Sequence, residues 1–131
     1  NSRSAKSFLL GVAAFDVHLT LVSPKESSLS NELVANIRSR LGHEPRIANE
    51  IDPLPWIRDA DVVRVNTGPY VINREVLKEM KGDVTILHPL PRGPEVARDL
   101  DKTKNAAYFR QVFCGLVTRM ALLSLILGKI K

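Results

Sequence analysis

The nine residues VTILHPLPR, Val84 to Arg92, carry the clearest structural signal in this chain. Val84-Thr-Ile-Leu87 is a nearly continuous apolar run, typical of a strand that is buried on both faces of a parallel sheet. Pro89 and Pro91 follow at once, and each removes a backbone N–H and restricts φ. We therefore predict a buried parallel strand that ends in a rigid corner.

Outward from this strand, helical and strand patterns alternate along the chain. Short β-branched runs predict three further strands, over residues 18–23, 46–48 and 61–65. Apolar residues at helical spacing predict helices over residues 4–15, 73–81 and 106–127, another between the serine cluster at 27–30 and Gly42, and a turn at 53–58. This alternation predicts an α/β fold, a single domain with a three-layer, doubly wound parallel sheet of the Rossmann-like type.

The composition fits one globular domain. The 131 residues are 44% hydrophobic and 25% charged, a balance that argues against disorder. The single cysteine, Cys114, excludes an internal disulfide framework and a cysteine-built zinc site. His88 has no acidic or cysteine partner at metal-ligand spacing, and no glycine-rich nucleotide motif is present, so we predict neither a metal nor a cofactor.

The net charge of +5 raises the question of anionic partners. Basic residues are spread along the chain without interleaved aromatic residues, so we predict no nucleic-acid binding. Thr118 and Arg119 interrupt the apolar run at residues 112–130, so we predict no membrane span. We expect a cytoplasmic protein, and the basic pI leaves an organelle (mitochondrion or plastid) as the alternative.

The corner after the buried strand is the first candidate site. Ligands of parallel sheets bind beyond the carboxyl ends of the strands, where His88-Pro-Leu-Pro-Arg92 begins. The two prolines leave the carbonyls of Pro89 and Leu90 free to accept hydrogen bonds from an amino or amide group of a ligand, and the X-Pro bonds are candidates for the cis form. The alternative is an ordinary rigid loop with a surface arginine.

Arg3, near the start of the first predicted helix, is the second candidate. A guanidinium at a helix N-terminus can bind a carboxylate together with the free N–H groups, whereas the alternative is a solvent-exposed arginine. Tyr108-Phe-Arg-Gln111, at the start of the last helix, is more typical of packing and capping. We expect His18 and His43 to be isolated residues at the surface or the core edge.

Several motifs follow one another in the C-terminal half, namely Ile86-Leu-His-Pro-Leu-Pro-Arg92, Glu95-Val96, Asp101-Lys102, Ala107-Tyr-Phe-Arg-Gln111 and Arg119-Met-Ala-Leu-Leu123. In order and spacing they resemble the second, L-aspartate-binding domain of aspartate carbamoyltransferases, within the aspartate/ornithine carbamoyltransferase superfamily. Ser2-Arg-Ser-Ala-Lys-Ser7 and Leu19-Thr-Leu-Val-Ser-Pro24 are similar to that domain's first helix and first strand. We therefore expect residues 1–131 to be such a domain, with the carbamoyl-phosphate domain absent.

The resemblance implies a reaction in pyrimidine biosynthesis. An amine attacks the carbamoyl carbon of carbamoyl phosphate, and the products are N-carbamoyl-L-aspartate and phosphate. By resemblance, Arg3 holds an aspartate carboxylate, and the Pro89 and Leu90 carbonyls orient the amino or carbamoyl nitrogen. His88 and Arg92 support the corner. No residue is assigned as catalytic, because positioning and charge stabilisation would do most of the work without a metal.

Three departures from the family pattern complicate this expectation. The carbamoyl-phosphate domain is absent, and Lys6 replaces the usual histidine of the opening helix motif. Thr67 and Pro69 stand where the family has an arginine and a glutamine that grip aspartate, and the loop that follows is shortened. Arg64 lies three residues too early, and an odd offset on a strand points a side chain to the other face.

Three functions remain open from the sequence. The first is the aspartate-binding half of an aspartate carbamoyltransferase, which binds aspartate or a related amino acid weakly and is active only with a carbamoyl-phosphate domain. The second is a catalytically inactive carbamoyltransferase-like domain, a structural subunit of a larger assembly. The third, carbamoyl transfer to another acceptor, remains open because the loop that selects the acceptor is the one that changed. We predict that the isolated chain is inactive. We also predict that the final helix contacts a carbamoyl-phosphate domain or other protein subunits through Val112, Phe113, Leu116, Val117, Met120, Leu123 and Leu127.

Overall fold

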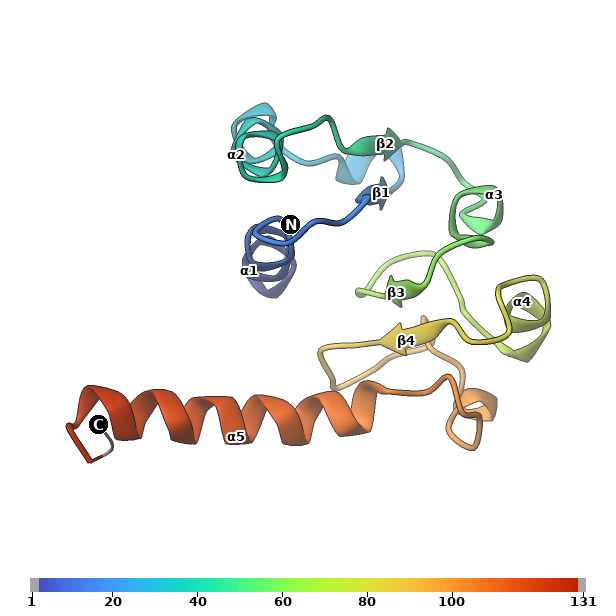
Figure 1. Cartoon of the computed structure of the whole chain (residues 1–131). Coiled ribbons are helices and arrows are strands. Elements are labelled where there is room, and N and C mark those ends of the chain that lie inside the picture. Colours follow the sequence, from blue (N-terminus) through green and yellow to red (C-terminus); the bar gives the residue numbers. More distant parts are fainter. Residues whose placement is uncertain (1–2, 130–131) are drawn as a thin grey trace. The chain divides into compact units, whose positions relative to one another are not determined.

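A computed structural model describes residues 3–129 of the chain. Its named strands all pair in parallel. Strand β1 (Thr20–Val22) pairs with β2 (Arg46–Ala48), and β3 (Val62–Arg64) pairs with β4 (Thr85–Leu87). The four strands lie within the four predicted ranges, so the prediction of an α/β fold with parallel strands is confirmed. The chain divides into two units, Asn1–Asp59 and Ala60–Lys131, and each unit holds one strand pair (Figure 1).

The pairing itself differs from the single sheet that we expected. Hydrogen bonds join the described strands into two sheets of two strands each. Both pairs consist of strands that are consecutive in the sequence and are joined by a helical crossover, which is the connection that parallel strands usually require. Each strand has only three residues, so its ladder is short.

The first unit contains the helices α1 (Arg3–Val12), α2 (Asn31–Leu41) and α3 (Leu54–Ile57) and the 3₁₀ turn η1 (Lys25–Ser27). Its core packs α1 against α2 through Leu9, Ala13, Leu33 and Ile37. The predicted boundaries of α2 are confirmed. Ser30 caps its start by accepting a hydrogen bond from the Leu33 N–H (3.3 Å), and Gly42 ends it at φ 75°, a left-handed conformation that favours glycine.

Two details of the first unit correct the sequence analysis. Helix α1 ends at Val12 instead of Phe15, because the chain tightens into i→i+3 bonds from Ala14 and Phe15, and the Phe15 side chain finds no core to join (70% exposed). His18 and His43 are not isolated, since their ring centroids are 5.6 Å apart.

The second unit is built around β4. On one side β4 pairs with β3, and on the other Ile86 forms a bridge with Ala106 just before the last helix. Val84 and Ile86 are fully buried, whereas Thr85 and Leu87 on the other face are half-buried, so the predicted burial on both faces is found on one face only. The unit also contains α4 (Arg74–Lys78), the 3₁₀ turn η2 (Arg98–Leu100) and the long helix α5 (Tyr108–Ile126).

Helix α5 packs on β4 only through its first residues. The predicted partner surface of this helix is exposed, with Phe113 at 65%, Met120 at 59% and Leu127, just beyond its end, at 68%. By length and composition alone, α5 is the one described helix that is apolar enough to cross a membrane, a test that core helices of other proteins also pass. The absence of a membrane span therefore stays a prediction.

Candidate functional site

The proline corner begins directly after β4, at the carboxyl end of the buried strand. The Leu90–Pro91 peptide bond is cis, as the sequence suggested for one of the X-Pro bonds. Leu90 has φ 49°, in the left-handed region that L-residues avoid at a cost of about 1–3 kcal/mol. Surrounding contacts must therefore hold the backbone of the corner in place.

His88 supplies several of these contacts, and its side chain is only 1% exposed. Its Nδ1 accepts a hydrogen bond from the Leu90 N–H (3.0 Å), so the proton of the neutral ring is assigned to Nε2. The His88 backbone N–H donates to Oε1 of Gln111 in α5 (3.1 Å). The His88 imidazole thus stabilises the strained residue, and the last helix fixes the start of the corner.

Glu95 faces the other side of the His88 ring and is equally buried, at 2% exposure. Its Oε1 lies 2.9 Å from Nε2 of His88, a contact that has the distance of an ion pair but not the angle of a good hydrogen bond. The same oxygen accepts the Gly93 N–H at 2.8 Å. This backbone bond, against the opposing effect of burial, lowers the pKa of Glu95, so the carboxylate is charged.

Gly93 is required by the position of this carboxylate. A Cβ at residue 93 would lie 2.7 Å from Oε2 of Glu95. Because Glu95 is buried and cannot move aside freely, we expect Gly93→Ala to lower the free energy of unfolding by about 1–3 kcal/mol, measured by urea denaturation. Gly82→Ala is the matched control, since nothing lies within 4 Å of its Cβ position. Equal stability of the two variants would contradict the conclusion that the Glu95 carboxylate requires a glycine at residue 93.

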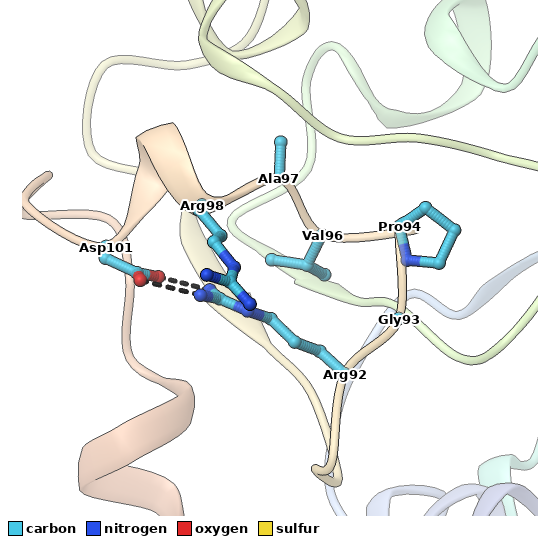
Figure 2. Close-up of a pocket in the computed structure, with 7 residues that line it drawn as sticks. All are labelled: Arg92, Gly93, Pro94, Val96, Ala97, Arg98 and Asp101. Atoms are coloured by element: carbon cyan, nitrogen blue, oxygen red, sulfur yellow. Dashed lines mark hydrogen bonds and ion pairs between the residues drawn. The ribbon is translucent and has the colours of Figure 1, made fainter.

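Arg92 forms the second support, on the outer side of the corner (Figure 2). Its two terminal nitrogens form a bidentate pair with Asp101, Nη2 to Oδ2 at 2.6 Å and Nη1 to Oδ1. Tyr108, the fully buried first residue of α5, donates its hydroxyl to Oδ1 of Asp101 (2.5 Å), and that hydroxyl lies 3.1 Å from Nη1 of Arg92. The Arg92–Asp101–Tyr108 cluster therefore joins the corner to the turn η2 and to α5.

The cluster changes the pKa values of its members. Hydrogen bonds from Arg92, and then from Tyr108, lower the pKa of Asp101 to about 2. Burial, and then the bond to Asp101, raise the pKa of Tyr108 to about 12. The Asp101 carboxylate in turn raises the pKa of Arg92. At neutral pH the cluster is therefore a charged pair with a protonated phenol.

These shifts predict how stability depends on pH. The contribution of Asp101 is complete above its unfolded pKa of 3.8 and is lost as the pH falls to about 2. The contribution of Tyr108 is complete below its unfolded pKa of 10.0 and is lost as the pH rises to about 12. We expect Tyr108→Phe to remove this alkaline loss in a series of thermal melts. If the melting temperatures of the unmodified chain and of Tyr108→Phe fall in parallel above the unfolded pKa of tyrosine, Tyr108 is not the source of the alkaline loss.

The structure brings most of the predicted site residues together. His88, Pro89, Leu90 and Arg92 share one corner, and neither carbonyl of Pro89 and Leu90 accepts a hydrogen bond from the described residues 3–129. Arg3 belongs to the first unit, where it is exposed at the first residue of α1. Ser2 of the motif around Arg3 lies outside the described residues. The corner thus presents two acceptors to a ligand N–H group.

Sequence analysis assigned no role to three residues that hold the corner, namely Glu95, Asp101 and Gln111. The signal available in the sequence was that Glu95 and Asp101 each adjoin an apolar residue, Val96 and Leu100. The structure buries both of these apolar residues fully. A carboxylate in such a place needs a nearby cation or donor. Tyr108 was expected to pack, which is confirmed. The expected cap at this helix start is wrong, since the N-cap is Ala107, without a side-chain bond.

The Arg64 side chain contacts the bend at residues 66–70, two positions further along the chain. Its Nη1 donates to Oδ1 of Asn66, the first residue of that bend, at 2.6 Å. Burial lowers the pKa of Arg64, although an arginine stays charged in proteins. A half-buried cation therefore lies at the carboxyl end of β3, beside Leu87, its partner residue in β4.

No metal-binding cluster accompanies the corner. Among the described residues, no group of three or more His, Cys, Asp or Glu side chains is placed to hold a metal ion. The chemistry that the corner offers is hydrogen bonding through carbonyl oxygens whose backbone is held by the His88–Glu95 contact and the Arg92–Asp101 ion pair. Such an arrangement suits the orientation of an amine or amide.

Comparison with known proteins places this corner in a family. Residues 64–126 match the model of the aspartate/ornithine carbamoyltransferase, Asp/Orn binding domain. The chain is 36% identical over 140 positions to the aspartate carbamoyltransferase catalytic subunit of Nitrosopumilus maritimus, with 97% of this chain and 45% of that subunit covered. The catalytic subunit of Leptospira biflexa is 37% identical over 142 positions, with 96% and 44% covered.

Solved structures agree on the fold. The aspartate transcarbamoylase from Trypanosoma cruzi, in complex with aspartate and phosphate, superposes with a TM-score of 0.82 at 22% identity, over 93% of this chain and 42% of that one. The chain thus spans a little under half the length of its relatives, and the part that it matches is the acceptor-binding part. On this basis, the chain belongs to the aspartate/ornithine carbamoyltransferase family and corresponds to its Asp/Orn binding domain.

Proposed function

We infer that this chain is the aspartate-binding half of an aspartate carbamoyltransferase. The amino nitrogen of L-aspartate would attack the carbamoyl carbon of carbamoyl phosphate. A C–N bond forms, the C–O bond to phosphate breaks and the nitrogen loses a proton, so that N-carbamoyl-L-aspartate and phosphate result. The observation that carries the proposal is the 36% identity to a catalytic subunit along 97% of the chain.

The corner would act by positioning the nucleophile. The Pro89 and Leu90 carbonyls accept hydrogen bonds from the aspartate amino group, and this fixes the direction of attack. Arg3, in the first unit, is assigned to an aspartate carboxylate by the family resemblance alone. His88 and Arg92 do not touch the reacting atoms in this proposal. They hold Leu90 and the corner backbone through Glu95 and Asp101. When two reactants are already held in the correct geometry, much of the entropy cost of bringing them together has been met before the reaction.

A partner domain is part of the proposal, because the relatives are about twice the length of the matched part. The exposed apolar side chains of α5 support such a partner, since contiguous patches of this kind are uncommon on monomers. A carbamoyl-phosphate domain seated on α5 would supply the second substrate. Without it, we expect the 131-residue chain to form no carbamoyl-aspartate.

The second candidate function, an inactive structural subunit, is favoured by one specific observation. The bend at residues 66–70 contains no arginine and no glutamine, whereas the resemblance implies both for gripping aspartate. The aligned stretch of 140 positions is also longer than this 131-residue chain, so the relative carries insertions that are missing here. An uncompensated ligand carboxylate in a desolvated site would bind weakly.

A chimeric subunit separates the two functions. This chain replaces the matched part of the Nitrosopumilus maritimus catalytic subunit, and carbamoyl-aspartate is measured by mass spectrometry. We expect product from the chimera, a several-fold loss with Arg3→Gln, and none from the chain alone. Binding of carbamoyl phosphate, measured by calorimetry, shows that the chimera is folded. A chimera that binds carbamoyl phosphate but makes no product would establish the inactive subunit instead.

A further inference from the structure

A second feature of the unit formed by Ala60–Lys131 is a cavity of about 600 Å³ behind the proline corner. It is lined by the segment from Arg92 to Ala97 apart from Glu95, and by two charged residues of the next turn, Arg98 and Asp101 (Figure 2). The carbonyls of Pro89 and Leu90 belong to residues outside this lining. Its volume lies in the range of about 300–1,000 Å³ that is typical of small-molecule sites.

The charges around the cavity do not balance. Two guanidinium groups, of Arg92 and Arg98, face a single carboxylate, that of Asp101. Arg92 uses both terminal nitrogens on Asp101. Within the described residues, the Arg98 side chain forms no hydrogen bond or ion pair, and its charge acts on Asp101 only through space. One positive charge at the cavity wall is therefore left without a counter-charge.

Neighbouring acids do not supply that counter-charge from the same wall. Asp99, the nearest acid in sequence to Arg98, accepts the Arg74 backbone N–H at 3.1 Å and lies outside the cavity lining. Glu95 is buried against His88 and Gly93. A ligand that carries a negative group would therefore complete the arrangement around Arg98.

The opposite part of the lining is apolar. Figure 2 shows Pro94, Val96 and Ala97 along the same segment that leads to Arg98. Val96 is 1% exposed and forms a bridge with Ile72, so it fixes this segment, and the accessible apolar surface is that of Pro94 and Ala97. The cavity thus combines a fixed apolar wall with an arginine that is free to pair.

We propose that this cavity binds a small organic oxyanion, a phosphate or carboxylate group on a compact apolar body. The anionic group pairs with Arg98, beside the Arg92–Asp101 pair, and the apolar body lies against Pro94 and Ala97. This site is independent of carbamoyl transfer at the Pro89 and Leu90 carbonyls. Its ligand would contact the support of the corner and not the reacting atoms.

The test is a titration of the full chain, observed by amide NMR, with phenyl phosphate, phenylacetate and inorganic phosphate. We expect saturable shifts at Val96, Ala97 and Arg98 with phenyl phosphate or phenylacetate. The more tightly bound of the two identifies the preferred anionic group. We expect weaker binding of inorganic phosphate, which lacks the apolar body. Equal affinity for inorganic phosphate would overturn the role of the apolar wall.

Two matched variants separate the site from general charge attraction. Arg98→Gln removes one charged hydrogen-bond donor and should weaken binding roughly tenfold or more. Lys104→Gln removes the same charge from a position that is exposed, as Arg98 is, but lies outside the lining, and it should change the affinity by less than about twofold. Neither side chain supports the core. Equal effects of the two variants, or no saturable binding, would overturn the proposal. Aspartate binding at Leu90 is observed separately through its own amide.

Discussion

Replacement of Tyr108 by alanine should lower the free energy of unfolding of the second unit by about 3–5 kcal/mol. The ring is fully buried at the start of α5, and its edge packs on Phe109 with centroids 4.9 Å apart. Deletion of a buried aromatic side chain leaves a cavity that the surroundings fill only in part. The hydroxyl between Asp101 and Arg92 is lost as well. Urea denaturation followed by far-ultraviolet circular dichroism measures the effect.

Two controls identify the origin of this loss. Tyr108→Phe keeps the ring and removes only the hydroxyl, so we expect a loss of about 1 kcal/mol. Phe113→Ala removes a ring of similar size from the same helix, but that ring is 65% exposed and should contribute within about 0.5 kcal/mol. The single tryptophan, Trp56, lies in the other unit, so its fluorescence follows the unfolding of that unit. If Phe113→Ala lowers the free energy of unfolding as much as Tyr108→Ala does, the Arg92–Asp101–Tyr108 cluster does not hold the start of α5 in place.

Removal of the buried carboxylate at Glu95 should have the second largest effect, a loss of about 3 kcal/mol for Glu95→Ala. The Gly93 N–H donates to Oε1 at 2.8 Å, and Nε2 of His88 lies 2.9 Å from the same oxygen. Without it, the Gly93 N–H loses its acceptor, the buried His88 ring loses its charged neighbour, and a cavity is left at residue 95. Denaturation at neutral pH measures this loss.

The isosteric variant distinguishes geometry from charge. A glutamine at residue 95 can place its carbonyl oxygen at the Oε1 position, so Glu95→Gln keeps the acceptor for the Gly93 N–H and should cost only about 1 kcal/mol. We also expect faster hydrogen exchange of the Leu90 amide in Glu95→Ala, because the His88 ring that accepts this N–H is then free to turn.

The control for the two Glu95 variants is a glutamate on the surface, Glu75. Glu75 forms an ion pair with Lys78 at 2.8 Å, but both side chains are well exposed. Its replacement by alanine should change the free energy of unfolding by no more than about 0.5 kcal/mol. A Glu95→Ala variant that is as stable as Glu75→Ala would show that the buried carboxylate does not hold the corner.

Much of the local structure was predictable, and the caps of α2 show why. Ser30 and Gly42 act through their own side chain and backbone within one turn of the helix, so neighbouring residues specify both ends. The strand at residues 84–87 was likewise predictable from a continuous apolar run. The corner was predictable because proline acts on its own peptide bond, and Leu90–Pro91 is cis.

Other features depend on contacts between residues that are distant in sequence. Arg92 pairs with Asp101 across nine positions, and Asp101 meets Tyr108 across seven, through a loop without periodic pattern. Nothing in the local sequence states which of several nearby acids a given arginine will meet. The pairing of Gln111 with the His88 backbone has the same origin.

The amino-acid sequence alone was enough to specify the α/β class, the ends of α2, the rigid corner and the family to which the chain belongs. Each of these rests on local preferences or on motifs. Only the folded chain decided which carboxylates hold that corner, how the strands pair and which charge of the cavity behind it stays uncompensated. These depend on burial, which makes an unpaired charge or donor costly and so selects its partner from all groups within reach.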